Sequence, residues 1–122
     1  MRLTQDSASA TNVIRAYREG EIKINEAVFH RPVIVSASVI AEGPEIANAD
    51  QLETAHAARI LELRPELVLL GTGARQQFPQ PQFGAQFLRD SIGFEVMDTG
   101  AACRTFNVLV GEQRRVVALL LP

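Results

Sequence analysis

Two apolar strands of this chain run into the same short turn, and this repeat constrains the fold more than any other feature. Residues 67–74 read Leu-Val-Leu-Leu-Gly-Thr-Gly-Ala, and residues 94–101 read Phe-Glu-Val-Met-Asp-Thr-Gly-Ala. Thr72 and Thr99 stand 27 residues apart, which fits one strand, one helix and the turns of a βα unit. If the strands are parallel, both turns open at the sheet edge where open α/β folds hold their ligands. The repeat therefore predicts a candidate site.

The first part of the chain favours β-structure. Residues 13–17 and 22–24 are rich in β-forming side chains on either side of a Glu19-Gly20 turn, which predicts a hairpin. Residues 33–40 predict a third strand, which begins after Pro32.

The second part alternates helix and strand. Asp50 and Glu53 have the spacing of a capping box, so a helix is expected from there. The remaining helices and strands follow from apolar periodicity and from glycine and proline at their ends. The predicted helices are 50–63, 81–92 and 99–110, and the predicted strands are 66–70, 94–97 and 115–121.

This alternation predicts an α/β fold with three layers. A mostly parallel central sheet carries helices on both faces, and the N-terminal hairpin adds antiparallel strands. Residues 12–122 are expected to form a single α/β domain after a loosely ordered tail over residues 1–11. The apolar last strand is expected either inside the sheet or at an edge, paired with another chain.

Composition narrows the class of protein. Of the 122 residues, 47% are hydrophobic and 21% are charged, as in soluble globular domains. The sequence lacks an apolar run near the roughly 18 residues of a membrane span, and its N-terminus lacks the apolar core of a secretory signal. A net charge of −2 argues against nucleic-acid binding. One cysteine, Cys103, is consistent with a reducing cytoplasm.

The two Thr-Gly turns and the side chains beside them form the candidate ligand-binding set. Glycine N–H groups and threonine hydroxyls can hold an anion, and the arginines would add positive charge. Turn geometry alone explains the same residues, so both interpretations stay open. The set is Gly71, Thr72, Gly73, Arg75, Asp98, Thr99, Gly100 and Arg104.

Other reactive side chains have simpler explanations. Asp98 is expected to cap a helix, with a general base or a cation ligand as alternatives. Cys103 is expected to be a small buried side chain, and His56 a satisfied, partly buried one. The sequence contains neither paired carboxylates nor metal-ligand spacing. We therefore predict no catalytic residue, no metal and no cofactor, and whether the chain is an enzyme stays open, with a lean toward no.

Phe78 stands in a polar loop over residues 74–82. An aromatic side chain on such a loop either anchors a protein partner or tucks beneath the loop. Arg104 falls opposite the apolar stripe of its helix, which favours solvent or a partner over a pocket.

Residues 65–73 and 93–109 together resemble a widespread family, the domain of unknown function 498. Its eukaryotic members include a mitochondrial respiratory complex I assembly factor and an adipogenesis-associated protein. The resemblance covers residues 13–121 and implies a three-layer β+α/β/α fold without established catalytic residues. The chain lacks the targeting segment of the organellar members, so a stand-alone bacterial protein is expected.

Two functions follow as hypotheses. The first is a non-catalytic binding or assembly domain with a protein partner, and the resemblance implies a role in respiratory complex assembly. The alternative is a small-molecule or anion-binding protein that uses the crevice between the two turns. The sequence leaves the oligomeric state open.

Overall fold

A computed structural model describes residues 11–122. Apart from Thr11, the predicted tail lies outside the described residues. The strands are β1 (Ile14–Arg18), β2 (Glu21–Ile24), β3 (Ala27–Phe29), β4 (Val33–Val35), β5 (Ile40–Glu42), β6 (Leu67–Thr72), β7 (Gly93–Met97) and β8 (Val116–Leu121). The helices are the short 3₁₀ turn η1 (Ala49–Gln51), α2 (Thr54–Leu61), α3 (Pro81–Arg89) and α4 (Thr99–Gly111).

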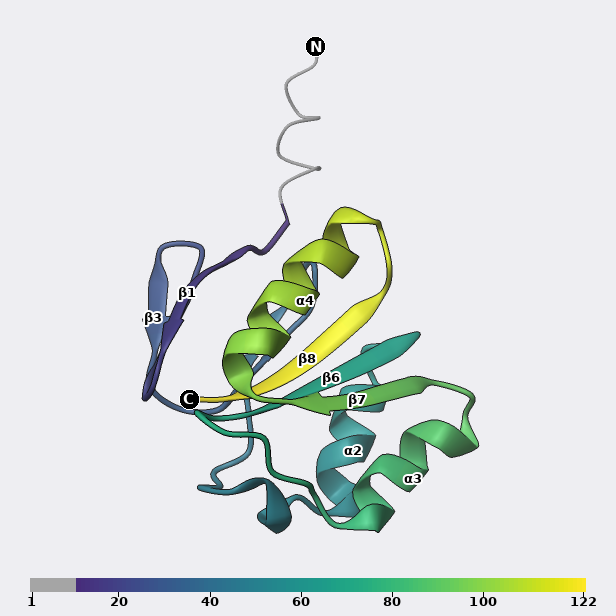
Figure 1. Ribbon diagram of the computed structural model, residues 1–122. Helices are drawn as coiled ribbons and strands as arrows, with labels where there is room; N and C mark the ends of the chain where they lie inside the picture. Colours follow the sequence, from purple (N-terminus) through teal and green to yellow (C-terminus); the bar gives the residue numbers. More distant parts are fainter. Residues whose placement is uncertain (1–10) are drawn as a thin grey trace.

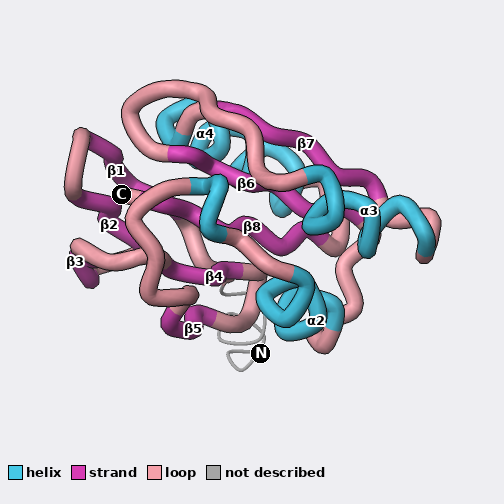
Figure 2. Tube along the Cα trace, turned by 90° about the horizontal axis from the view of Figure 1, so that it is seen from below, coloured by secondary structure: helices cyan, strands magenta, loops and turns pink. Residues whose placement is uncertain are grey.

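The central sheet has five strands in the order β5-β4-β8-β6-β7 (Figure 2). Strand β6 pairs in parallel with β7 and with β8, whereas β4 runs antiparallel to both β5 and β8. The sheet is therefore mixed, and the prediction that it is mostly parallel is not confirmed. Strands joined through a helix can pair in parallel, as β6 does with β7. Strands β4 and β5 are joined by a tight turn instead, so they pair antiparallel.

This sheet is the middle one of three layers (Figure 1). On one face, α4 and the antiparallel sheet β1-β2-β3 bury a cluster that includes Ile22, Ile24 and Phe106. On the other face, α2 and α3 bury a second cluster that includes Phe83 and Phe87. Helices thus cover both faces, as expected, and the β-layer stands beside α4.

The predicted hairpin is present, but it continues into a third strand. Strands β1 and β2 pair through the Glu19-Gly20 turn, and Gly20 takes the positive φ of 88° that such a turn favours. Strand β3 then pairs with β2. The strand predicted over residues 33–40 is confirmed only over residues 33–35, which form β4, because the chain turns back before β5. The Ser36 hydroxyl accepts the Val39 N–H at 3.1 Å and holds that turn.

The helix predicted over residues 50–63 is shorter and begins later. The Asn48 N–H donates to the Gln51 side chain at 2.9 Å, which caps η1. The Glu53 N–H donates to His56 Nδ1 at 2.9 Å where α2 begins. The predicted pairing of Asp50 with Glu53 is thus replaced by two consecutive caps, and His56 is satisfied as expected.

Strand β8 lies between β4 and β6 and is buried along its whole length. Both of its faces are covered, which explains its uninterrupted apolar sequence. The alternative of an edge strand for residues 115–121 is therefore excluded.

Candidate functional site

The two Thr-Gly turns come together as the repeat predicts. Strands β6 and β7 are parallel neighbours, with Gly71 opposite Met97. The Thr99 N–H donates to the Gly73 carbonyl at 2.9 Å, so the turns are in direct contact. The carboxyl ends of the parallel strands therefore meet at one edge.

The hydroxyl of Thr99 is used inside the fold. Its side chain is completely buried. Oγ1 donates to the Leu121 carbonyl at 2.6 Å and accepts the Gly73 N–H at 2.7 Å. One hydroxyl thereby joins the ends of β6 and β8 to the first turn of α4, and the Gly73 N–H is no longer open to an anion.

Gly71 lets α4 approach β6 closely. A Cβ atom at this position would lie 2.9 Å from Thr99 Oγ1 and 3.1 Å from the Ala102 Cβ, closer than ordinary van der Waals contact. Any larger residue would push the helix away from the strand. The glycine of the repeat thus serves packing.

Thr72 organises the loop that follows β6. Its hydroxyl donates to the Arg75 carbonyl at 2.7 Å and accepts the Gln77 N–H at 3.0 Å. The Gln76 side chain donates to the Val96 carbonyl at 3.0 Å and ties the loop to β7. Phe78, which follows Gln77 on this loop, is 70% exposed. The alternative in which Phe78 tucks beneath the loop is excluded, because a fixed backbone presents the ring to solvent.

Asp98 is the N-cap of α4. Its carboxylate accepts the Ala101 N–H at 2.8 Å, as the capping interpretation predicts. The side chains of Tyr17 and Arg104 both lie close to Gly100: a Cβ atom there would be 3.5 Å from a Tyr17 ring carbon and 3.6 Å from an Arg104 guanidinium nitrogen. Arg75 and Arg104 are exposed, and neither forms an ion pair with a carboxylate of residues 11–122.

Cys103 is a buried member of the cluster beneath α4. Burial raises the pKa of its thiol to about 11, against a smaller opposing effect of the Arg104 charge. Beside it, the Tyr17 hydroxyl is buried without a hydrogen-bond partner among the described residues, and burial is the main reason that its pKa is raised. An unionised, buried thiol is a packing group, which agrees with the prediction.

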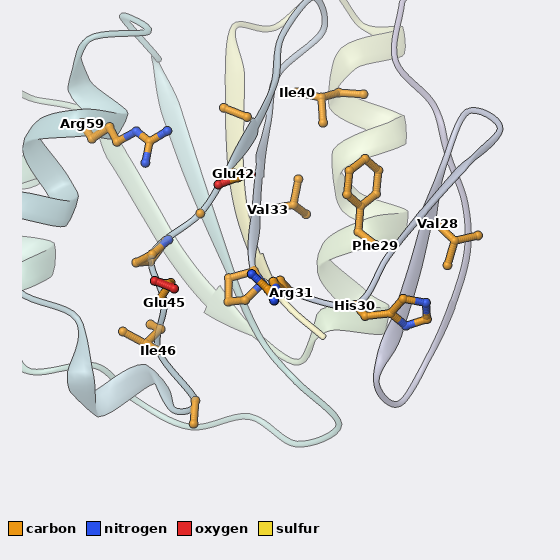
Figure 3. A pocket seen from close by; sticks show the side chains of 15 residues that line it. Val28, Phe29, His30, Arg31, Val33, Ile40, Glu42, Glu45, Ile46 and Arg59 are labelled. Carbon is orange, nitrogen blue, oxygen red and sulfur yellow. The ribbon is translucent and has the colours of Figure 1, made fainter.

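A groove at the β5 edge of the sheet lies outside every candidate set from the sequence (Figure 3). It encloses about 1090 Å³ between β3, β5 and the segment over residues 43–47. Its wall includes Val28, Ile40, Glu42 and Arg59. The Ser-Ala-Ser sequence at residues 36–38 could have signalled this edge, because it interrupts the apolar run with turn formers.

Known proteins share this fold and sequence. Residues 14–121 match a family described as a protein of unknown function (DUF498/DUF598). The chain belongs to this family. A crystal structure of a Bordetella parapertussis protein superposes with a TM-score of 0.87 at 35% identity, covering 94% of this chain and 98% of that one. The family resemblance seen in the sequence is thus confirmed.

Two named relatives are among those that match nearly the whole chain. The chain is 32% identical to the zebrafish NADH dehydrogenase [ubiquinone] 1 alpha subcomplex assembly factor 3, over 98% of this chain and 70% of that protein. It is 28% identical to the 13 kDa major membrane protein of Francisella tularensis, over 99% of both. None of the helices in residues 11–122 has the length and apolar character needed to cross a membrane. Within the same range, no three histidine, cysteine, aspartate or glutamate side chains lie close enough together to hold a metal ion.

Proposed function

We propose that the chain is a non-catalytic assembly domain that binds a protein partner in the building of a respiratory complex. The observation that carries this proposal is Phe78, an exposed aromatic ring on a loop held by the Thr72 hydroxyl and by Gln76. Aromatic side chains on fixed backbones are frequent centres of protein interfaces, because little conformational freedom is lost on binding. The named assembly factor among the relatives supports a partner in complex assembly.

The small-molecule alternative has weaker support. The threonine hydroxyls that would face a ligand already bond to carbonyl groups of the chain, and the Gly73 N–H is also taken. Arg75 and Arg104 supply exposed charge, but neither lies beside a polar group of these turns that is free to hold an anion with it. The turns therefore serve the fold and the loop rather than a bound anion.

The test compares two exposed apolar side chains in the full chain. Phe78 and Leu88 are 70% and 69% exposed, but Leu88 lies on α3 and not on the loop. With tagged variants expressed in the protein's own cells, Phe78→Ala should lose respiratory-complex subunits that wild type and Leu88→Ala both retain. All three should have the same melting temperature. If Phe78→Ala retains the same subunits, the loop is not the partner surface.

A further inference from the structure

The free edge of β5 carries backbone groups that the described chain does not use. The Gly43 N–H donates to the Pro32 carbonyl at 2.8 Å just beyond the strand, which fixes the phase of the β4–β5 ladder. Hydrogen-bonded pairs alternate along an antiparallel ladder, so Ala41 bonds to β4. Ile40 and Glu42 then point their N–H and C=O groups away from β4, and no group in residues 11–122 meets them.

The other edge of the same sheet is treated differently. At β7, the Gln76 side chain donates to the Val96 carbonyl and covers part of the edge. Exposed edges invite pairing with other chains, and proteins commonly protect them in this way. At β5, no side chain of the described residues forms a hydrogen bond with the backbone of Ile40 or Glu42, although both strands end the same sheet.

The open edge forms one side of the groove of about 1090 Å³ (Figure 3). Strand β3 forms the facing wall, and the exposed side chains of Val28 and Ile40 line the two sides. A groove walled on both sides suits a single extended segment. Two copies of this concave surface would leave a void between them.

We propose that β5 binds an extended segment of a protein partner as an added strand of the central sheet. This inference rests on the proposed function, because it takes the partner to be a protein, but it uses a different surface from Phe78. The backbone groups of Ile40 and Glu42 supply the hydrogen bonds, as in other cases of strand addition.

The side chains beside β5 define the chemistry of that segment. Ala41 packs into the cluster under α2, and Arg59 projects from α2 into the groove without an ion pair to any described carboxylate. A partner residue opposite Ala41 should therefore be acidic. Ile40 and Glu42 lie on the β3 side, where Val28 is exposed and Glu42 disfavours a second acid, so the neighbouring partner residues should be apolar.

The probe is a synthetic peptide, capped at both ends, in which valine and aspartate alternate. It is titrated to millimolar concentration into the ¹⁵N-labelled full chain, with a second peptide that has lysine in place of aspartate. We expect the amide signals of Ile40, Glu42 and their neighbours to shift, and the aspartate peptide to bind more tightly. Phe78→Ala should not alter these shifts, so this test and that of the proposed function fail independently.

Three variants separate recognition through the backbone from recognition through side chains. Glu42→Pro removes one outward N–H and should weaken binding about fivefold, whereas Glu42→Thr keeps that N–H and should bind at least as well as wild type. Arg59→Gln should lower the preference for aspartate over lysine about threefold.

Three results would overturn the proposal. The first is no shift at β5 with millimolar peptide. The second is equal binding by Glu42→Pro and Glu42→Thr. The third is a concentration-dependent dimer whose Ile40 and Glu42 amides are protected from exchange without peptide, which would assign the edge to a second copy of the chain.

Discussion

The carboxyl ends of β6 and β7 and the free edge of β5 belong to one sheet, but they use their polar groups in opposite ways. At the strand ends, the Thr99 hydroxyl joins Gly73 to Leu121, and the Thr72 hydroxyl closes the following loop. At β5, the outward groups of Ile40 and Glu42 meet no described residue. At the position where α/β folds often bind ligands, the hydroxyls of Thr72 and Thr99 and the Gly73 N–H are used inside the fold, whereas an edge without a sequence motif is open. Polar residues at a familiar position therefore indicate a site only after their internal partners are known.

The largest expected effect comes from Thr99→Val, which removes the hydroxyl that closes the strand ends. Both the Gly73 N–H and the Leu121 carbonyl would then be buried without a partner, which should cost about 3 kcal/mol of unfolding free energy. Urea denaturation measures this loss. Thr105→Val, on the same helix, is the control and should change stability by less than about 0.5 kcal/mol.

A different result for Thr99→Val would contradict the view that the Thr-Gly turns serve the fold rather than a ligand. If the variant were as stable as wild type but lost a phosphate-dependent rise in melting temperature, the turns would be a ligand site after all.

Gly71→Ala should have the next largest effect. The new methyl group would lie 2.9 Å from Thr99 Oγ1, so α4 must shift, at a cost of about 2 kcal/mol. Gly111→Ala is the matched control, because no atom lies within 4 Å of its Cβ position and alanine favours a helix. Equal stability of the two variants in thermal unfolding would show that the helix does not need this close approach.

A smaller effect is expected at Asp98. Asp98→Ala removes the cap of α4 and should lower the unfolding free energy by about 1 kcal/mol, whereas Asp98→Asn keeps an accepting oxygen and should be nearly neutral. Chemical denaturation of both variants checks this order. An asparagine variant as unstable as the alanine variant would mean that the negative charge matters, as a base or cation ligand at this turn would require.

The second half of the fold was predictable from the sequence, and the first half only in part. Apolar runs that end at glycine or proline placed β6, α3, β7, α4 and β8 to within a few residues. The turn between β4 and β5 was missed because only the short Ser-Ala-Ser sequence at residues 36–38 marks it, and the turn depends on a hydrogen bond to the Ser36 side chain. The sequence also did not show that β4 runs antiparallel to β8, since that pairing joins segments far apart in the chain.

For the candidate site, the sequence predicted which residues lie close together, but not which of their polar groups are free to bind a ligand. The repeat correctly placed Gly73 beside Thr99, and capping preferences correctly assigned Asp98. That the Thr99 hydroxyl reaches Leu121 could not be read from spacing, because the position of β8 beside β6 is set by the whole sheet. The groove was missed for the same reason, since β3 and β5 face each other across it only once the whole chain has folded.

The smallest expected change in stability near neutral pH concerns Cys103, the group beside the turns whose chemistry would first suggest reactivity. Burial raises its pKa from 9.0 to about 11, so the fraction of reactive thiolate at pH 8 falls about 100-fold. Reaction with a disulfide reagent should therefore be at least about 100-fold slower in the native chain than in urea. As the pH rises, the thiol of the unfolded chain ionises before that of the folded chain. The stability that comes from burying the neutral thiol is therefore fully present below pH 9 and is lost as the pH rises toward 11. Cys103→Ala should lack this part of the alkaline loss. Rapid native labelling at pH 8 would instead mean that the region under α4 opens, and the contrast between closed turns and an open edge would no longer hold.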